Sequence, residues 1–247
     1  MNYREYGKEN SKVIMLIHGG GLSWWNYRKE AQLLKNDYRV ILPVLDGHAD
    51  SDRPFVSIED NASEIISFIN DNFGGHILLL GGLSLGGQVL LEMLAQRSDI
   101  CEYAIVESAA VIPSRFTHMM VAPAFGSCYG LIRNKRFAKI QFDSLHMNED
   151  FFDDYYRDTC AIGKRDLIAF MKANTAYMLK GSIAECSAKV TVVTGEKENR
   201  EVLRSADILE QKMPKCSKQI QPGLHHGEFS LNYAESYVQL IKQILEE

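Results

Sequence analysis

Short apolar runs alternate along the chain with longer stretches in which apolar residues recur at helical spacing. The runs are continuous and rich in β-branched residues, which is typical of strands buried on both faces of a parallel sheet. The segment 57–73 instead places Ile58, Ala62, Ile65 and Ile69 on one helical face. The pattern predicts strands at Lys12–Ile17, Arg39–Val44, His76–Leu80, Glu102–Val106, Lys189–Val193 and Lys218–Ile220. It predicts helices at Trp25–Leu34, Ser57–Phe73 and Tyr233–Leu245, and a further helix that begins near Gly87.

Residues 113–182 interrupt this alternation, because they contain no clear strand pattern yet many aromatic residues. The chain has 11 Phe and 11 Tyr, and 11 of these aromatic residues fall in this segment. A long insertion over the ends of strands often acts as a lid. We therefore expect an α/β core formed by residues 1–112 and 183–247, with an inserted helical cap at residues 113–182. A helical subdomain with only its own small core is the simpler alternative.

Composition and charge narrow the class of protein. The chain has 247 residues, 46% of them hydrophobic, and a formal net charge of −5, which suits one globular domain. Lys and Arg form no basic cluster of the kind that binds nucleic acid, and no apolar stretch is long enough for a membrane span. The five cysteines are scattered, and the N-terminus lacks an apolar signal core. We expect a cytoplasmic protein without a metal site, and its oligomeric state stays open.

The stretch GGLSLGG at 81–87 places one serine among four glycines, between a predicted strand and a predicted helix. An ordinary glycine-rich turn is one interpretation. The other is that Gly82-Leu83-Ser84-Leu85-Gly86 fits the pattern G-x-S-x-G, in which a strained turn lifts the serine hydroxyl clear of the backbone. In that pattern glycines flank the serine because strand and helix backbones pass too closely there for a Cβ atom. Ser84 is therefore a candidate nucleophile.

Candidate partners for Ser84 follow later predicted strands. A serine hydroxyl is a poor nucleophile unless a base takes its proton, and a third group must orient that base. Glu196 and Glu198 follow one predicted strand, and His225 and His226 follow the last one. Because ligand sites of parallel sheets lie outside the carboxyl ends of the strands, these side chains are expected near Ser84.

The order of serine, acid and histidine resembles that of the α/β-hydrolase superfamily. The resemblance extends from about residue 12 to residue 245 and is weakest in the segment 113–182. The family acid commonly ends a Gly-x-x-Asp segment after a strand, and Gly-Glu-Lys-Glu at this place implies Glu198 as the acid, with Glu196 as its rival. The family histidine often follows Gly-x-Gly, so Gly-Leu-His-His implies His226 as the base in preference to His225.

The same resemblance implies an oxyanion hole. His-Gly-Gly-Gly at 18–21 resembles the family's His-Gly-x segment, which implies backbone N–H donors at Gly20 and Leu85. A merely flexible glycine loop is the alternative. Trp24 is expected to contact substrate, although core packing explains it equally well, and His18 is expected to stabilise its loop rather than transfer protons.

The resemblance further implies a serine hydrolase that cleaves an ester or related acyl bond through an acyl-enzyme, with a small-molecule acyl substrate and no cofactor. An aromatic and Met-rich cap favours a small or medium, largely apolar acyl group, so a carboxylesterase (EC 3.1) is the expected activity. A thioesterase, an acyltransferase or other chemistry of the fold is the nearest alternative, and a ligand-binding member without turnover is a further one. Because only Met1–Tyr6 are available to form a strand before Lys12–Ile17, we expect the sheet to lack one or both of the family's opening antiparallel strands.

Overall fold

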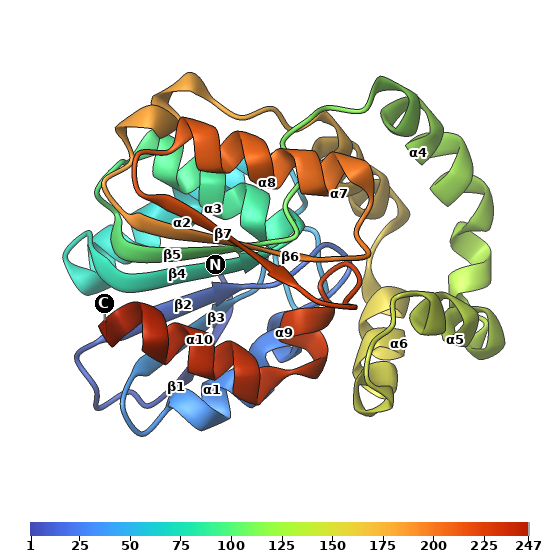
Figure 1. Cartoon of the computed structure of the whole chain (residues 1–247). Helices are drawn as coiled ribbons and strands as arrows, with labels where there is room; N and C mark the ends of the chain where they lie inside the picture. The colour runs from blue at the N-terminus through green and yellow to red at the C-terminus, as the bar shows by residue number, and fades with distance from the viewer. Residues whose placement is uncertain (247) are drawn as a thin grey trace.

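A twisted sheet of seven strands runs through the part of the chain that the computed structural model describes, residues 1–246 (Figure 1). The strand order is β1-β3-β2-β4-β5-β6-β7, and all neighbouring pairs are parallel except β1 with β3. This arrangement confirms the predicted α/β fold with a mostly parallel sheet. The strands are β1 (Tyr3–Tyr6), β2 (Val13–Ile17), β3 (Arg39–Pro43), β4 (Ile77–Leu83), β5 (Cys101–Glu107), β6 (Lys189–Gly195) and β7 (Cys216–Gln221).

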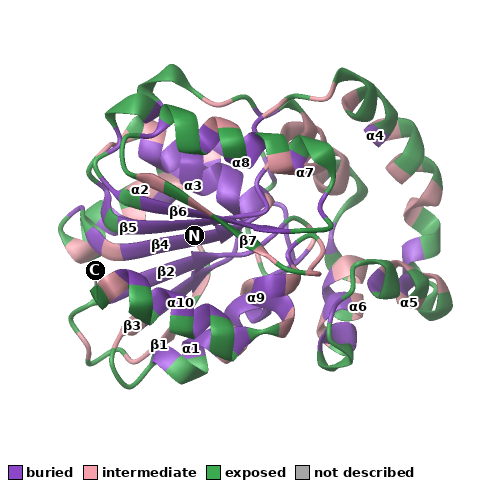
Figure 2. Ribbon diagram, in the orientation of Figure 1, coloured by how far each residue is buried: buried purple, intermediate pink, exposed green. Residues whose placement is uncertain are grey.

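Helices cover both faces of the sheet, so successive residues of a strand enter two different cores. In β2, Met15 and Ile17 pack into one core, while Ile14 and Leu16 pack into the other. The central strands are accordingly buried along most of their length (Figure 2). One face is covered by α2 (Ile58–Phe73), α3 (Leu85–Gln96), η4 (Gly181–Glu185) and α8 (Arg200–Lys212), and the other by η1 (Trp24–Tyr27), α1 (Arg28–Leu34), α9 (Glu228–Asn232) and α10 (Ala234–Glu246).

Three elements lie outside the pattern that the sequence predicts. The strand β1 pairs antiparallel with β3, so the edge of the sheet has a single antiparallel strand within the described residues. The helix α8 buries Val202, Ser205, Ala206 and Leu209 on one face, a helical spacing that the sequence analysis did not pick out. The five-residue helix α9 is too short for a periodic pattern to be read.

The segment 113–182 is helical and lies between β5 and β6 in the sequence. Its helices project beyond the ends of the strands (Figure 1). One hydrogen bond from this segment to the rest of the protein is buried: Trp25 Nε1 donates to Asp158 Oδ2 at 2.6 Å. The division into a core and a cap stays a prediction. The elements are α4 (Arg115–Cys128), η2 (Tyr129–Arg133), α5 (Lys135–Ser144), η3 (Glu149–Phe151), α6 (Phe152–Ala161) and α7 (Lys164–Ala176).

The glycines around Ser84 lie where backbones cross closely. A Cβ atom on Gly82 would lie 2.5 Å from the carbonyl oxygen of Gly86, and one on Gly86 would lie 2.5 Å from that of His18. The neighbours are backbone atoms, which cannot rotate away. This crowding agrees with the reason that the sequence pattern gives for glycine at both positions.

We expect Gly86→Ala to lower the free energy of unfolding by about 1–3 kcal/mol, because the added methyl group overpacks a fixed backbone crossing. Gly181→Ala is the matched control, since a Cβ atom there meets no neighbour within 4 Å. Urea unfolding of both variants measures the difference. Equal unfolding free energies for the two variants would show that the crossing adapts without strain.

Candidate active site

Ser84 lies at the junction between β4 and α3, in a backbone conformation that non-glycine residues rarely adopt. Its φ is 53° and its ψ is −110°. The Ser84 N–H donates to the carbonyl of Glu107 at 2.8 Å, and the Ser84 carbonyl accepts from the N–H of Gln88 at 3.0 Å. The neighbouring strand β5 and the helix α3 after Ser84 therefore both hold this strained residue in place.

His226 lies in the loop after β7 and contacts Ser84 across the sheet edge. Its Nε2 is 3.0 Å from Ser84 Oγ, and its Nδ1 is 2.8 Å from Glu198 Oε2. A carboxylate only accepts, so the Nδ1 proton points to Glu198 and Nε2 is left as the acceptor that faces the serine hydroxyl. The His226 side chain is 47% exposed, whereas that of Glu198 is fully buried.

Glu198 follows β6 and is held by a residue that the sequence analysis did not single out. The Ser108 hydroxyl donates to Glu198 Oε1 and accepts from the Gly227 N–H at 3.2 Å. Ser108 has a φ of 55° and lies directly after β5. Its place after a predicted strand, at the same sheet edge as Ser84, was the available signal. Ser108 thus links the loop of the acid to the loop of the histidine.

The surroundings of His226 favour its protonated form. The protein packed against the ring lowers the pKa, but the hydrogen bond that His226 donates to Glu198 and the charges of Glu198 and Glu107 outweigh this effect. The pKa of His226 is therefore raised above its ordinary value of 6.5. An imidazole with a raised pKa is the stronger base, which suits a group that takes a proton from Ser84.

A second buried carboxyl group lies behind this cluster. Glu107 ends β5, and its Oε1 accepts from the Ser230 N–H at 3.1 Å. Burial raises the pKa of Glu107 to about 7, while its hydrogen bonds with Ser230 act in the opposite direction. Because Glu107 also contributes to the raised pKa of His226, it belongs to the electrostatics of the site although it does not contact Ser84 through its side chain.

The two rival residues have other partners. Glu196 is exposed, and its Oε2 accepts from the Gly223 N–H at 2.8 Å. His225 pairs with Glu228 at 3.1 Å, and its ring stacks on that of His146 with the centroids 3.9 Å apart. The structure therefore brings Ser84, His226 and Glu198 together, and it turns Glu196 and His225 to other contacts.

The loop with the predicted oxyanion donors lies against the start of α3. A Cβ atom on Gly20 would touch the Leu85 side chain at 3.4 Å, so the two residues are neighbours. Leu85 is the first residue of α3, and the N–H groups of a first helical turn have no partner within the helix. His18 supports the loop, because its Nε2 accepts from the Leu45 N–H at 3.1 Å and its Nδ1 donates to the Gly19 carbonyl at 2.8 Å. Burial lowers the pKa of His18 to about 3, so the ring stays neutral.

Trp24 lies apart from this arrangement. Its ring is 5.2 Å from the Arg4 guanidinium and 5.9 Å from that of Arg28, and it packs on the core beneath η1. It is absent from the residues that line the cavity next to Gly20. Contact between Trp24 and substrate stays a prediction.

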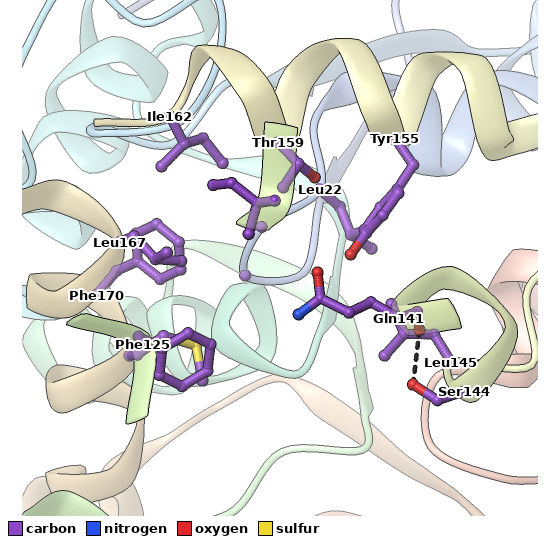
Figure 3. A pocket seen from close by; sticks show the side chains of 14 residues that line it. Leu22, Phe125, Gln141, Ser144, Leu145, Tyr155, Thr159, Ile162, Leu167 and Phe170 are labelled. Carbon is purple, nitrogen blue, oxygen red and sulfur yellow. Dashed lines mark hydrogen bonds between the residues drawn. The ribbon is translucent and has the colours of Figure 1, made fainter. Parts of the chain in front are cut away.

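A cavity of about 290 Å³ lies between the Gly20–Leu22 loop and the helical segment 113–182 (Figure 3). Its walls are mainly apolar side chains, and Gly20 itself lines it. The cavity therefore begins at the loop predicted to bind the oxyanion. The other residues that line it are Gly21, Leu22, Phe125, Ile132, Gln141, Ser144, Leu145, Tyr155, Thr159, Ile162, Leu167, Phe170 and Met171.

Residues 1–246 contain no group of three or more His, Cys, Asp and Glu side chains placed to hold a metal ion. None of the helices they form is both long and apolar enough to span a membrane. The five cysteines, all within this range, are free.

Three solved structures resemble nearly the whole chain at low sequence identity. An esterase from Exiguobacterium antarcticum superposes with a TM-score of 0.83 at 18% identity, covering 99% of this chain and 95% of that one. An enol-lactonase from Burkholderia xenovorans LB400 has a TM-score of 0.80 at 15% identity, with coverages of 100% and 96%. A thermophilic esterase from Thermogutta terrifontis has a TM-score of 0.79 at 17% identity, with coverages of 99% and 92%. These likenesses describe the fold.

Sequence comparison adds a relative and a family. The uncharacterized hydrolase YugF of Bacillus subtilis (strain 168) is 26% identical over 101 residues, and this match covers 40% of this chain and 37% of that protein. The match thus spans little more than a third of the relative. Residues 14–238 match the model of the alpha/beta hydrolase family, which is most of the chain. The chain belongs to the α/β hydrolase family, because this match covers most of its length and agrees with the sheet order and the strained Ser84.

Proposed function

We propose that the protein is a serine hydrolase that cleaves an ester of a small or medium, largely apolar substrate through an acyl-enzyme. The observation that supports this most directly is the continuous hydrogen-bonded chain from Ser84 Oγ through both ring nitrogens of His226 to the buried carboxylate of Glu198, with distances of 3.0 and 2.8 Å. A nucleophile, a base and an orienting acid in this order have the geometry required for nucleophilic catalysis.

In the acylation half of the proposed reaction, Ser84 Oγ attacks the ester carbonyl while its proton passes to His226 Nε2. The carbonyl π electrons move to the oxygen and form a tetrahedral oxyanion. Backbone N–H groups of Gly20 and Leu85 stabilise that negative charge, and the N-terminal end of α3 adds a favourable partial charge. Collapse of the intermediate breaks the bond to the alcohol oxygen, which takes the proton from His226.

In the deacylation half, His226 takes a proton from water, and the resulting hydroxide attacks the acyl carbonyl. Collapse of the second tetrahedral intermediate breaks the bond to Ser84 Oγ, which takes the proton from His226 Nε2, and the carboxylic acid is released. Glu198 keeps the Nδ1 proton in place and stabilises the positive ring in both halves. These steps need no redox change and no external cofactor.

The substrate class is proposed from the cavity beside Gly20. Its largely apolar walls suit an apolar acyl or alcohol group, and a volume of about 290 Å³ suits a small or medium one. Helices of the segment 113–182 contribute most of its lining, so we propose that this segment is the cap of the site. A carboxylesterase is therefore the activity we favour within the family.

The proposal is tested by treating the protein with a fluorophosphonate and by assaying p-nitrophenyl acetate and butyrate. We expect covalent labelling at Ser84, located by peptide mass spectrometry, and release of p-nitrophenol from both esters. Labelling without ester turnover would move the protein to another acyl-transfer class, such as a thioesterase or an acyltransferase. Absence of labelling would overturn the nucleophile and favour a ligand-binding role.

A further inference from the structure

The cavity under the helical segment is not uniformly apolar. Two polar side chains from adjacent helices, Gln141 of α5 and Thr159 of α6, line it among aromatic and aliphatic neighbours. Figure 3 shows the Gln141 amide reaching into the space between Tyr155 and Phe125. The Gln141 amide is thus a polar group among cavity walls that are mainly apolar.

The inward atoms of these two side chains are buried without a hydrogen bond. Both Gln141 Oε1 and Thr159 Oγ1 have no partner in the structure. The Thr159 hydroxyl lies beside Tyr155, where it offsets part of the rise that burial causes in the pKa of Tyr155, so the Gln141 amide is the more isolated of the two groups. A buried polar atom without a partner is costly, so the Gln141 amide is a site that gains from a hydrogen-bonding group brought by a ligand.

Ser144 shows that a polar residue can line this cavity without such a need. It lies one turn after Gln141 in α5, and its hydroxyl donates to the backbone carbonyl of Gln141 at 2.6 Å (Figure 3). That hydrogen bond stays within the helix and uses the only hydroxyl proton, so Ser144 has no donor left for a ligand. Ser144 is therefore a natural control for Gln141.

The charge of the cavity limits the group that Gln141 could recognise. None of the described residues that line it is Lys, Arg, His, Asp or Glu. An ionised group would lose its hydration there without gaining an opposite charge, which is strongly unfavourable. An uncharged group that can both donate and accept, such as a primary carboxamide or an alcohol, fits an amide side chain on both counts.

We propose that Gln141 is a specificity residue: it binds an uncharged hydrogen-bonding group on the part of the substrate that lies under the helical segment, away from the ester bond. The substrate class becomes an ester whose apolar chain ends in a neutral polar group rather than in a methyl group. This inference rests on the proposed esterase function, because the cavity begins at Gly20.

The test compares matched esters with wild type, Gln141→Leu and Ser144→Ala. One series consists of p-nitrophenyl esters of four to eight carbons ending in a methyl or a carboxamide group. The other series consists of acetate esters of alcohols with the same end groups. Their hydrolysis is measured by the release of acetic acid. p-Nitrophenyl acetate, which is too short to reach the subsite, reports the chemistry and the folding of each variant.

At one chain length we expect wild type to prefer the carboxamide ester over its methyl counterpart by about tenfold in kcat/KM, on the acyl or the alcohol side. Gln141→Leu should abolish this preference while keeping hydrolysis of p-nitrophenyl acetate, and Ser144→Ala should retain the preference. Equal preferences in wild type and Gln141→Leu in both series, with the acetate hydrolysed normally, would overturn the subsite alone. If wild type itself does not hydrolyse p-nitrophenyl acetate, the result would instead count against the proposed function.

Discussion

Ser84→Ala is expected to lower kcat/KM for p-nitrophenyl butyrate by roughly 10⁵–10⁶-fold, the scale seen when a catalytic serine is removed from a hydrolase with an intact oxyanion hole. The substitution removes only the hydroxyl group of the residue. Alanine keeps a Cβ atom at a φ of 53°, so the backbone strain at the turn is unchanged. The loss should therefore be one of chemistry rather than of folding.

Thermal unfolding of Ser84→Ala beside wild type checks that separation, and the two midpoints should agree within about 2 °C. Ser127→Ala, whose hydroxyl donates to the Ala124 carbonyl within α4 and which does not line the cavity, should keep wild-type hydrolysis of the same ester. If Ser84→Ala kept more than a tenth of the wild-type rate, another group would have to be the nucleophile.

Glu198→Gln is expected to lower kcat by about 10⁴-fold, as an amide in place of a triad carboxylate does elsewhere. An amide NH₂ group at the Oε2 position would donate to Nδ1 of His226 and shift the ring proton to Nε2. The base would then present a proton to Ser84 instead of an acceptor. Glu196→Gln is the matched control, because Glu196 bonds only to the exposed Gly223 turn, and it should retain wild-type kcat.

The same variant gives a pH signature. The base acts only when neutral, so kcat/KM should rise with pH through the pKa of His226, which in wild type lies above 6.5. Glu198 raises that pKa by its hydrogen bond and its charge, so Glu198→Gln should move the acidic limb of the profile to lower pH. An unshifted limb in the residual activity would show that Glu198 is not coupled to the base.

The sequence predicted the sheet better than the junctions between its elements. Continuous apolar runs identified five strands because both faces of a parallel sheet are buried, whereas the edge strand β7 has no such run and buries none of its residues. The run His76–Leu80 underestimated β4, which continues to Leu83, because glycine favours no strand by itself and is held there by pairing with β2 and β5. Pairing partners are a tertiary property, and no local pattern reveals them.

The candidate site shows the same division. The G-x-S-x-G pattern selected Ser84, and position after strands selected the two alternative pairs, since strand ends meet at one edge of the sheet. The family resemblance gave the preference for Glu198 over Glu196 and for His226 over His225. Its physical reason, which side chain turns inward, follows from loop geometry that the sequence does not show. Ser108 went unnoticed because its part in the site is a hydrogen bond to a residue 90 positions away.

In the reaction that we propose, the half-exposed ring of His226 bears on which molecule reaches the acyl-enzyme. Because close to half of the His226 side chain is exposed and His226 does not line the cavity, we expect water to reach the base without displacement of the helices 113–182. Any other nucleophile would therefore compete with bulk solvent at an open surface. We expect the acyl group to partition to water, with added alcohols diverting it only in proportion to their concentration.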